Sequence, residues 1–248
     1  MPAPIILIQA RCGSRRLPRK VLADICGKPV LEWVIYRCSR SHLVGGIVVL
    51  TSELEQDNPV AALAVDLGIP VYRGSEGDVL FRYVSAARQF RAQLIVRVTA
   101  DCPFIDSDII DEVIGLNEQC QADYVCINGY PEGVGAAELV RLSALETALK
   151  RTTPTDTFYR EHVTTYLTDH PSMFDVHCPM AQEHLRRVDV HLSVDTTADL
   201  EQARRIAEYF QPWRDFRVTD ILDWITSASA IRESSHAKIL NNSHKGTG

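Results

Sequence analysis

Short apolar runs alternate with segments of helical periodicity through the first half of this 248-residue chain, and this alternation limits its fold more than any other feature. The runs are rich in β-branched residues and lack alternating polar positions, as strands buried on both faces of a parallel sheet do. The predicted strands are 4–10, 46–51, 71–72 and 94–99. The predicted helices between and after them are 29–40, 59–67, 78–90 and 107–116, the last capped by Ser107. Strands and helices at this spacing predict βαβ units, and therefore an α/β fold with a mostly parallel sheet and helices on both faces.

The second half of the chain does not continue the regular alternation of strands and helices. It contains a Gly/Pro-rich loop at 128–135 among shorter predicted elements: strands at 122–127, 173–177 and 188–194, and helices at 143–150, 158–167 and 198–210. The length suits one large domain, which we place at 1–226, with an inserted arm at about 128–185. The segment 227–248 ends in a polar Ser/Asn/Gly-rich stretch, so we predict a disordered tail there.

Composition excludes several classes of protein. The net charge of −6 argues against a general nucleic-acid binder, whose surface would be basic overall. No apolar run approaches the length of a membrane span, and the first one is too short for a secretory signal. The seven cysteines are scattered without a Cys-x-x-Cys pair, which favours reduced thiols over a disulfide framework or a zinc site. The eight histidines show no ligand spacing. We therefore predict a cytoplasmic protein that binds neither nucleic acid nor membrane.

The densest chemical feature is the segment 11–20, in which five of ten residues are cationic. It follows a predicted buried strand, and Gly13 permits a tight turn that exposes backbone amides. Guanidinium forks, an ammonium and free amides together suit a polyphosphate. The spacing matches neither the Walker motif nor the Gly-x-Gly-x-x-Gly fingerprint. The alternative, a solvated basic turn, is disfavoured by the position of the segment at the end of a strand.

Two aspartates also follow predicted strands. Asp101 comes after the strand 94–99 and Asp195 after the strand 188–194, and ligands bind at the carboxyl ends of parallel strands. Mg²⁺ commonly takes one or two protein carboxylates together with phosphates and waters. Asp101 or Asp106 could instead cap the next turn, which we favour for Asp106. The sequence from Thr196 to Asp199 predicts a capping box. Spacing alone leaves the pairing of the two aspartates open.

Several motifs occur in colinear order between about residues 5 and 210. The N-terminal one is Gln9-Ala10-Arg11-x-Gly13-Ser14-x-Arg16-Leu17-Pro18-x-Lys20. The others are Gly27-Lys28-Pro29, Val71-Tyr72-Arg73-Gly74-Ser75-x-x-Asp78-Val79-Leu80, Asp101-Cys102-Pro103, Arg160-Glu161-His162-Val163 and Asp195-Thr196. With these motifs the chain resembles the acylneuraminate and 3-deoxy-manno-octulosonate cytidylyltransferases, most of all the spore-coat polysaccharide branch. Ala100, where the family usually has glycine, and Cys12 depart from the pattern without removing a charged group.

The resemblance implies a nucleotide-diphospho-sugar transferase (Rossmann-like) fold, with an arm that often makes a homodimer. It implies an enzyme that uses CTP and Mg²⁺ to form a CMP-sugar and releases pyrophosphate. The expected triphosphate ligands are Arg11, Ser14, Arg16 and Lys20, and the expected cytidine contacts are Arg73 and Ser75. Ala10, Gly13 and Thr99 are expected to complete the nucleotide site, and Asp101 and Asp195 to coordinate Mg²⁺. Arg11, Lys20 and Asp101 are the expected catalytic residues, and Arg160, Glu161, His162 and the loop 128–138 are expected to border the acceptor.

The predicted function is therefore a CTP-dependent cytidylyltransferase that makes a CMP-activated acid sugar, or a related CMP- or CDP-linked metabolite, for cell-surface polysaccharide. One alternative uses another nucleotide or a phosphate- or phosphonate-bearing acceptor. Another is a catalytically inactive nucleotide-binding subunit, against which the intact Lys20, Asp101 and Asp195 argue. A nucleic-acid-binding module is disfavoured by the acidic net charge.

Overall fold

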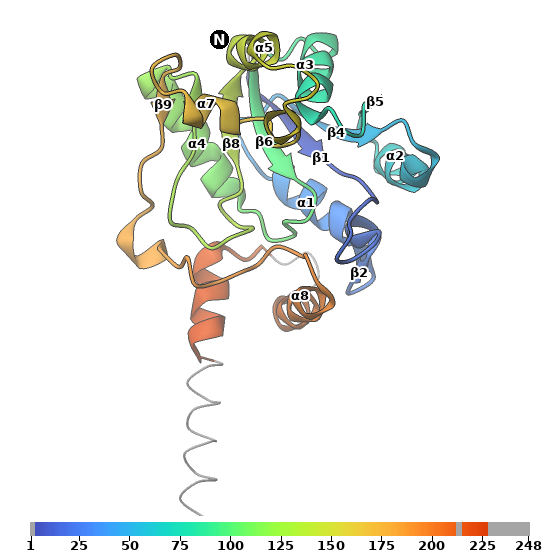
Figure 1. Cartoon of the computed structure of the whole chain (residues 1–248). Helices are drawn as coiled ribbons and strands as arrows, with labels where there is room; N and C mark the ends of the chain where they lie inside the picture. The colour runs from blue at the N-terminus through green and yellow to red at the C-terminus, as the bar shows by residue number, and fades with distance from the viewer. Residues whose placement is uncertain (1–2, 212–214, 228–248) are drawn as a thin grey trace, which may run out of the picture.

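A computed structural model describes residues 3–211 and 215–227 of the chain, and a seven-stranded sheet forms its centre (Figure 1). The strand order is β5-β4-β1-β6-β8-β7-β9. The strands are β1 (Ile5–Gln9), β4 (Gly46–Ser52), β5 (Val71–Gly74), β6 (Leu94–Thr99), β7 (Tyr124–Val125), β8 (Glu138–Arg141) and β9 (Val176–His177). Every neighbouring pair is parallel except the two pairs that β8 makes. The mostly parallel sheet predicted from the sequence is therefore confirmed.

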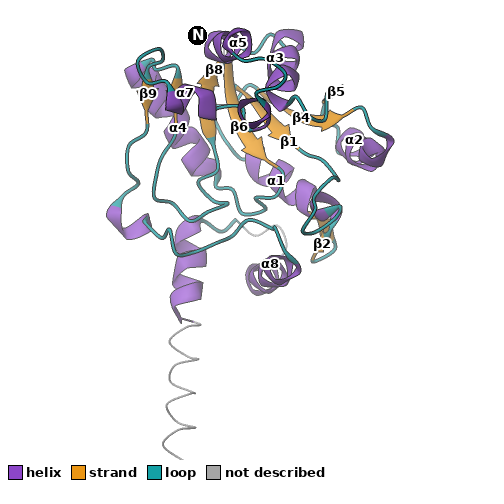
Figure 2. Ribbon diagram, viewed as in Figure 1, coloured by secondary structure: helices purple, strands orange, loops and turns teal. Residues whose placement is uncertain are grey.

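Helices surround this sheet (Figure 2). They are α1 (Val30–Cys38), α2 (Asn58–Asp66), α3 (Val79–Gln89), α4 (Ser107–Cys120), α5 (Leu142–Arg151), α6 (Thr157–Glu161), α7 (Thr165–Asp169) and α8 (Thr197–Phe210), and residues 218–227 are also helical. The short elements are the 3₁₀ turns η1 (Lys20–Leu22), η2 (Glu55–Asp57) and η3 (Glu183–Leu185) and a hairpin of β2 (Asp24–Ile25) and β3 (Lys28–Pro29).

The two faces of the sheet belong to two separate hydrophobic clusters. In β1, Ile6 and Ile8 join the cluster that contains the buried residues of α1, α2 and α4. Leu7, between them, joins the cluster of α3 and α5. Successive side chains of a strand point to opposite faces, so this division shows helices packed on both faces, as predicted.

The order of strands reverses direction next to β1. From β1 the chain continues outward to β4 and then β5, whereas β6 lies on the other side of β1. Gln9 at the end of β1 pairs in register with Thr99 at the end of β6, so the loops that follow these two strands begin side by side. Open α/β sheets bind their ligands at such a switch point, outside the carboxyl ends of the strands.

Two predictions for the second half of the chain are wrong. The segment 158–167 is not one helix, because α6 ends at Glu161 and Val163 has a left-handed backbone (φ 44°) that a continuous helix does not admit. The segment 188–194 is not a strand: among the described residues its sole bridge joins His191 to Glu132, and Val188 is 81% exposed.

Strand β8 was not predicted, because its apolar content is only Leu139 and Val140, which point to opposite clusters. The helix α4 is capped by Asp106 instead of Ser107, since the Asp106 carboxylate accepts a hydrogen bond from the amide of Asp108 at 2.9 Å. This confirms the capping role that we favoured for Asp106.

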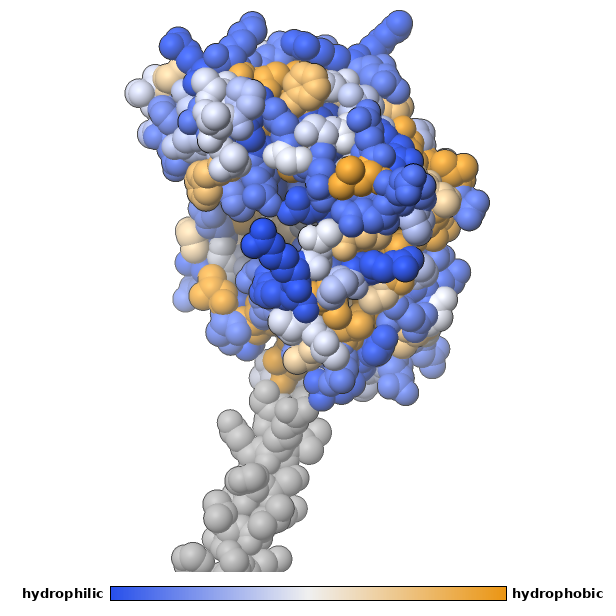
Figure 3. Space-filling model, turned by 45° about the vertical axis from the view of Figure 1, so that its right-hand side comes forward, coloured by the Kyte–Doolittle hydropathy of each residue, from blue (hydrophilic) through white to orange (hydrophobic). Residues whose placement is uncertain are grey.

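The stretch expected as an inserted arm, 128–185, is only partly separate from the sheet. It contributes β8 and β9 to the sheet, while 178–185 continues along one side of the molecule toward α8 (Figure 1). All but the first residue of the expected tail, 227–248, lie outside the described residues. Within 3–211 and 215–227, every helix is too short or too polar to cross a membrane. The face shown in Figure 3 is mostly hydrophilic, with apolar residues in small separate groups.

Candidate active site

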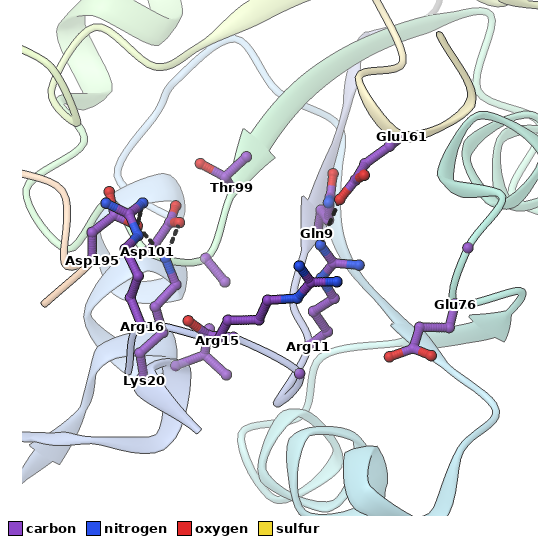
Figure 4. A pocket seen from close by; sticks show the side chains of 15 residues that line it. Gln9, Arg11, Arg15, Arg16, Lys20, Glu76, Thr99, Asp101, Glu161 and Asp195 are labelled. Atoms are coloured by element: carbon purple, nitrogen blue, oxygen red, sulfur yellow. Dashed lines mark hydrogen bonds and ion pairs between the residues drawn. The ribbon is translucent and has the colours of Figure 1, made fainter. Parts of the chain in front are cut away.

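A cavity of about 750 Å³ opens at the carboxyl ends of β1 and β6, a size typical of small-molecule sites. Four cations and four carboxylates lie along its wall (Figure 4). Its lining residues are Gln9, Arg11, Gly13, Ser14, Arg15, Arg16, Lys20, Val21, Glu76, Gly77, Thr99, Ala100, Asp101, Glu161 and Asp195. Such a lining suits a ligand that is both large and highly charged.

Hydrogen bonds to the backbone of Cys12 hold the basic loop after β1 in place. The Cys12 amide donates to Oδ1 of the buried Asp57 at 2.6 Å, and the Cys12 carbonyl accepts from the amides of Ser14 (2.9 Å) and Arg19 (3.1 Å). Arg19 has a left-handed backbone (φ 58°), which turns the chain into η1 at Lys20. The loop therefore folds back over the sheet edge, and four of its five cationic side chains, all except that of Arg19, line the cavity.

Lys20 lies between the two aspartates expected to bind metal. Its Nζ is 2.6 Å from Asp101 Oδ2 and 2.8 Å from Asp195 Oδ1, and a guanidinium nitrogen of Arg16 also approaches Asp195 Oδ1 at 2.8 Å (Figure 4). Burial lowers the pKa of Lys20, but the charges and hydrogen bonds of both carboxylates outweigh burial and raise that pKa above its ordinary value. Burial raises the pKa of Asp195, but Lys20 and Arg16 outweigh it and hold that pKa below its ordinary value.

A backbone contact brings Asp195 to Asp101. The amide of Val194 donates to the carbonyl of Asp101 at 2.8 Å, so the segment before α8 lies directly on the loop after β6. The capping box of Thr196 and Asp199 then begins α8, as predicted. The structure thus places together two aspartates whose pairing the spacing had left open.

A second group of polar side chains supports Asp195 from the side away from Lys20. His191 contacts Glu132 Oε2 through Nδ1 at 2.9 Å and Ser193 Oγ through Nε2 at 3.1 Å. The Ser193 hydroxyl also donates to Asp195 Oδ2 at 3.4 Å. Ligand atoms of Glu132, His191 and Asp195 all lie within 4.8 Å of one another, so these three could hold a metal ion. Glu132 lies in the loop 128–138 that was expected to border the acceptor, but its contact with His191 was not predicted, because it depends on how two loops cross.

Helix α6 contributes one residue of the expected acceptor triplet to the cavity. Glu161 Oε1 accepts from Arg11 at 2.8 Å. Arg160 is buried instead, and its guanidinium donates to Asp78 Oδ2 at 2.6 Å and to Thr152 Oγ1 at 3.0 Å, which fastens α6 to the start of α3. Among the described residues, the lining includes Glu161 but not Arg160 or His162.

Three expected nucleotide-site residues lie outside the described lining: Ala10, Arg73 and Ser75. The Arg73 guanidinium donates to the carbonyls of Ser52 and Leu54 and to Asn58 Oδ1, so it holds the segment after β4. The contact of Arg73 and Ser75 with the cytidine stays a prediction, as does the place of Ala10 in the nucleotide site. Gln9, Arg15 and Glu76 line the cavity without having been predicted, although Gln9 and Arg15 lie within the N-terminal motif.

The family model for cytidylyltransferases matches residues 5–217 of the chain. The chain belongs to the cytidylyltransferase family. This cytidylyltransferase is 32% identical over 206 residues to the spore coat polysaccharide biosynthesis protein SpsF of Bacillus subtilis, a match that covers 82% of this chain and 85% of SpsF. It is 34% identical over 116 residues to the 3-deoxy-manno-octulosonate cytidylyltransferase of Anaeromyxobacter dehalogenans, covering 46% of each protein.

A solved structure agrees with this assignment. A cytidylyltransferase from Leptospira borgpetersenii superposes with a TM-score of 0.85 at 29% identity, covering 93% of this chain and 97% of that one. The family resemblance found in the sequence, including its spore-coat branch, is therefore confirmed, as is the nucleotide-diphospho-sugar transferase fold. The chain is an enzyme of the nucleotidyltransferase class (EC 2.7.7 type).

Proposed function

We propose that this cytidylyltransferase joins CMP from CTP to an acid sugar and releases pyrophosphate, in the synthesis of cell-surface polysaccharide. The observation that carries the proposal is the cluster of Lys20, Asp101 and Asp195 at the switch point of the sheet. Two relatives, a spore coat polysaccharide biosynthesis protein and a 3-deoxy-manno-octulosonate cytidylyltransferase, support the choice of acceptor class.

The charge balance of the cavity supports a requirement for Mg²⁺. The four cations of the lining are matched by four carboxylates, so the bare cavity does not compensate the roughly four negative charges of a nucleoside triphosphate. Asp101 and Asp195 already converge on one cation, the Lys20 ammonium, and carboxylate oxygens are the donors that Mg²⁺ prefers. These two residues fit the ion and would hold it. When bound, Mg²⁺ supplies positive charge that stabilises the phosphate oxygens during transfer.

The cationic side chains of the basic loop would bind the triphosphate. Lys20 keeps its proton at neutral pH because its pKa is raised, so its ammonium can turn from the carboxylates to a phosphate oxygen. Arg11 is oriented by Glu161, and Arg16 by Asp195. In-line displacement at the α-phosphorus depends mainly on alignment and charge neutralisation, and prepositioned donors of this kind supply both.

The acceptor would enter on the side of the cavity formed by Gln9, Arg11 and Glu161. Figure 4 shows these three side chains across the cavity from Asp101 and Asp195. We therefore propose that Glu161 contacts the acceptor, as the resemblance implied, while Arg11, which Glu161 holds at 2.8 Å, binds the triphosphate beside it.

A pyrophosphate-release assay tests the function directly. The protein with Mg²⁺ is offered each of the four nucleoside triphosphates together with 2-keto-3-deoxy acid sugars, and then with phosphate- and phosphonate-bearing acceptors. We expect release with CTP and an acid sugar. Release that requires a phosphate or phosphonate acceptor would replace the proposed acceptor class. Calorimetric binding of CTP without release under any condition would indicate an inactive nucleotide-binding subunit.

The variant Asp101→Asn identifies the site responsible. Removing one of the two carboxylates should lower turnover at least about a hundredfold with the fold intact, since such a group acts mainly in the transition state. Glu118→Gln, an exposed carboxylate on α4, is the matched control and should keep wild-type turnover. Wild-type turnover of Asp101→Asn would remove Asp101 from the mechanism.

A further inference from the structure

Two cysteines meet at the edge of the sheet farthest from β5. Strands β7 and β9 pair in parallel, with Tyr124 opposite Val176 and Val125 opposite His177. Cys126 and Cys178 are the next residues of the two chains, and their Sγ atoms are 2.6 Å apart. This separation is only about half an ångström longer than a disulfide bond of ~2.05 Å. The two sulfurs are therefore already placed within reach of bond formation.

The backbone on both sides fixes this placement. The amide of Cys126 donates to the carbonyl of His177 at 3.2 Å, and the amide of Asn128 donates to the carbonyl of Pro179 at 2.9 Å. The side-chain amide of Asn128 also donates to the carbonyl of Cys178 at 3.2 Å. Because the two segments are bonded before and after the cysteines, the sulfurs can meet without a movement of the chain.

The pair is also accessible, unlike several other cysteines. Cys126 and Cys178 are both partly exposed and both pack against the hydrophobic cluster of α3 and α5, so they share one face of the sheet. Cys12, Cys38 and Cys102 are buried. A small oxidant can therefore reach the pair from solvent more easily than it can reach these three.

Cys178 has the character of a nucleophile. The hydrogen bond from the Cys126 thiol outweighs burial and lowers the pKa of Cys178 to about 7. The same hydrogen bond, together with burial, raises the pKa of Cys126. A thiol of lowered pKa carries more thiolate at neutral pH, which is the form that reacts with peroxides.

We propose that Cys126 and Cys178 form an oxidant-sensitive thiol pair that hydrogen peroxide converts to a disulfide. The Cys178 thiolate attacks one peroxide oxygen, the O–O bond breaks, and the hydroxide released takes up a proton to become water. Cys126 then attacks the sulfur of the resulting sulfenic acid. The S–S bond forms, the S–O bond breaks, and the leaving hydroxide departs as water with the Cys126 proton. The two thiols thereby lose two electrons, which reduce the peroxide, and a dithiol reductant reverses the change.

The disulfide would fasten a weak edge of the sheet. Strand β9 has two residues, so few hydrogen bonds hold it against β7. The link would also fix the start of the loop 128–135, whose Glu132 contacts His191 beside Asp195. We expect oxidation to slow amide hydrogen exchange in β9.

Intact-mass measurement of the full chain tests the proposal. The protein is treated with a small excess of hydrogen peroxide at pH 7, and we expect a loss of about 2 Da that dithiothreitol reverses, the mass of two hydrogens lost when a disulfide forms. Peptide mapping should then find Cys126 linked to Cys178. A disulfide between other cysteines, or added oxygen without the 2 Da loss, would overturn the proposal.

Serine variants assign a role to each sulfur. Cys126→Ser should lose the 2 Da change and instead accumulate a sulfenic acid on Cys178 that dimedone traps. Cys178→Ser should show neither product at position 126. Cys120→Ser, a partly exposed cysteine at the end of α4, is the matched control and should retain the 2 Da loss. Circular dichroism melts of each variant check that it folds. Equal dimedone labelling of Cys178 in Cys126→Ser and of Cys126 in Cys178→Ser would contradict the assigned roles.

Discussion

Lys20 shows how one side chain serves both the folded protein and its chemistry. In the free enzyme the ammonium neutralises Asp101 and Asp195 at 2.6 and 2.8 Å, and 12% of its side chain is exposed. Two carboxylates this close to each other would otherwise repel. In the proposed mechanism the same ammonium would become available to phosphate when Mg²⁺ takes its place between the aspartates. The position therefore stabilises the free cavity and prepares it for a charged ligand.

The variant Lys20→Met should be less stable than the wild type by about 1–3 kcal/mol at pH 7, because it leaves two carboxylates without their shared cation. The pKa of Asp195 is lowered in the folded state, so this stabilisation is present above the ordinary carboxyl pKa of about 4 and is lost as pH falls through the lower folded value. The stability gap should therefore be complete between pH 5 and 7 and narrow below about pH 4.

Urea denaturation of the ligand-free protein at several pH values measures this gap. Lys150→Met, an exposed lysine at the end of α5, is the control and should change stability by no more than about 0.5 kcal/mol. A gap for Lys20→Met that stays constant down to pH 3.5 would contradict the linkage to Asp195. The same variant should also bind CTP more weakly by calorimetry and lose pyrophosphate release.

At the scale of elements, two crossing loops place Asp195. The loop 128–135 pairs with the segment before α8 through a bridge between Glu132 and His191, and the amide of Leu192 donates to the carbonyl of Glu132 at 2.8 Å. Gly133 has φ +88°, and a Cβ on it would lie 2.5 Å from the amide nitrogen of Ser193. The crossing is therefore possible only with glycine at this position.

The variant Gly133→Ala should lower stability by about 1–3 kcal/mol, since it combines a left-handed backbone with a backbone clash. It should also reduce pyrophosphate release, because the displaced segment carries Asp195. The control is Gly115→Ala in α4, where a Cβ would meet nothing within 4 Å and the helix should gain about 0.5–1 kcal/mol. Equal melting temperatures and equal activity for the two variants would show that the crossing does not position the site.

The whole molecule encloses the cavity with segments from five parts of the chain. They are the loops after β1 and β6, the turn before α3, the end of α6 and the segment before α8. The ion pairs Arg11–Glu161 and Arg16–Asp195 join some of these segments, and ion pairs between partly exposed side chains individually contribute little to stability. A ligand that touches all five should therefore join them more firmly than they are joined in the free protein.

CTP together with Mg²⁺ should raise the melting temperature, and at a hundredfold excess over Kd the added stability is about 2.7 kcal/mol. CTP with EDTA should have a much smaller effect, because Asp101 and Asp195 then face the phosphates without a divalent ion. Differential scanning fluorimetry compares the two conditions. An equal shift with and without the metal would argue against Mg²⁺ at these aspartates.

The homodimer that the resemblance implied can be tested at the same scale. Size-exclusion chromatography with light scattering should give twice the chain mass of 27.7 kDa. A mass of one chain over the micromolar range would show that the cavity functions within a single copy.

The sequence by itself determined the parallel part of the sheet, its covering helices and the position of the basic loop after the first strand. These follow from local patterns: short β-branched runs at the strands β1, β4 and β6, helical periodicity between them, and a basic segment directly after the first strand. Capping by Asp106 and by Thr196 with Asp199 was equally local, because each involves residues at most three positions apart. Local sequence patterns predict secondary structure well where an element is buried against the core, because burial restricts which residues can occupy each position.

Only the tertiary structure decided which distant side chains meet. Asp195 reaches Asp101 through a backbone contact of Val194, and Cys126 reaches Cys178 because β9 pairs with β7. The predicted helix at 158–167 and strand at 188–194 failed in the same part of the chain, where neighbouring elements determine conformation more than local propensity does. Contacts between segments far apart in sequence depend on the register in which strands and loops cross. Neither the spacing of motifs nor the composition of the chain predicts that register.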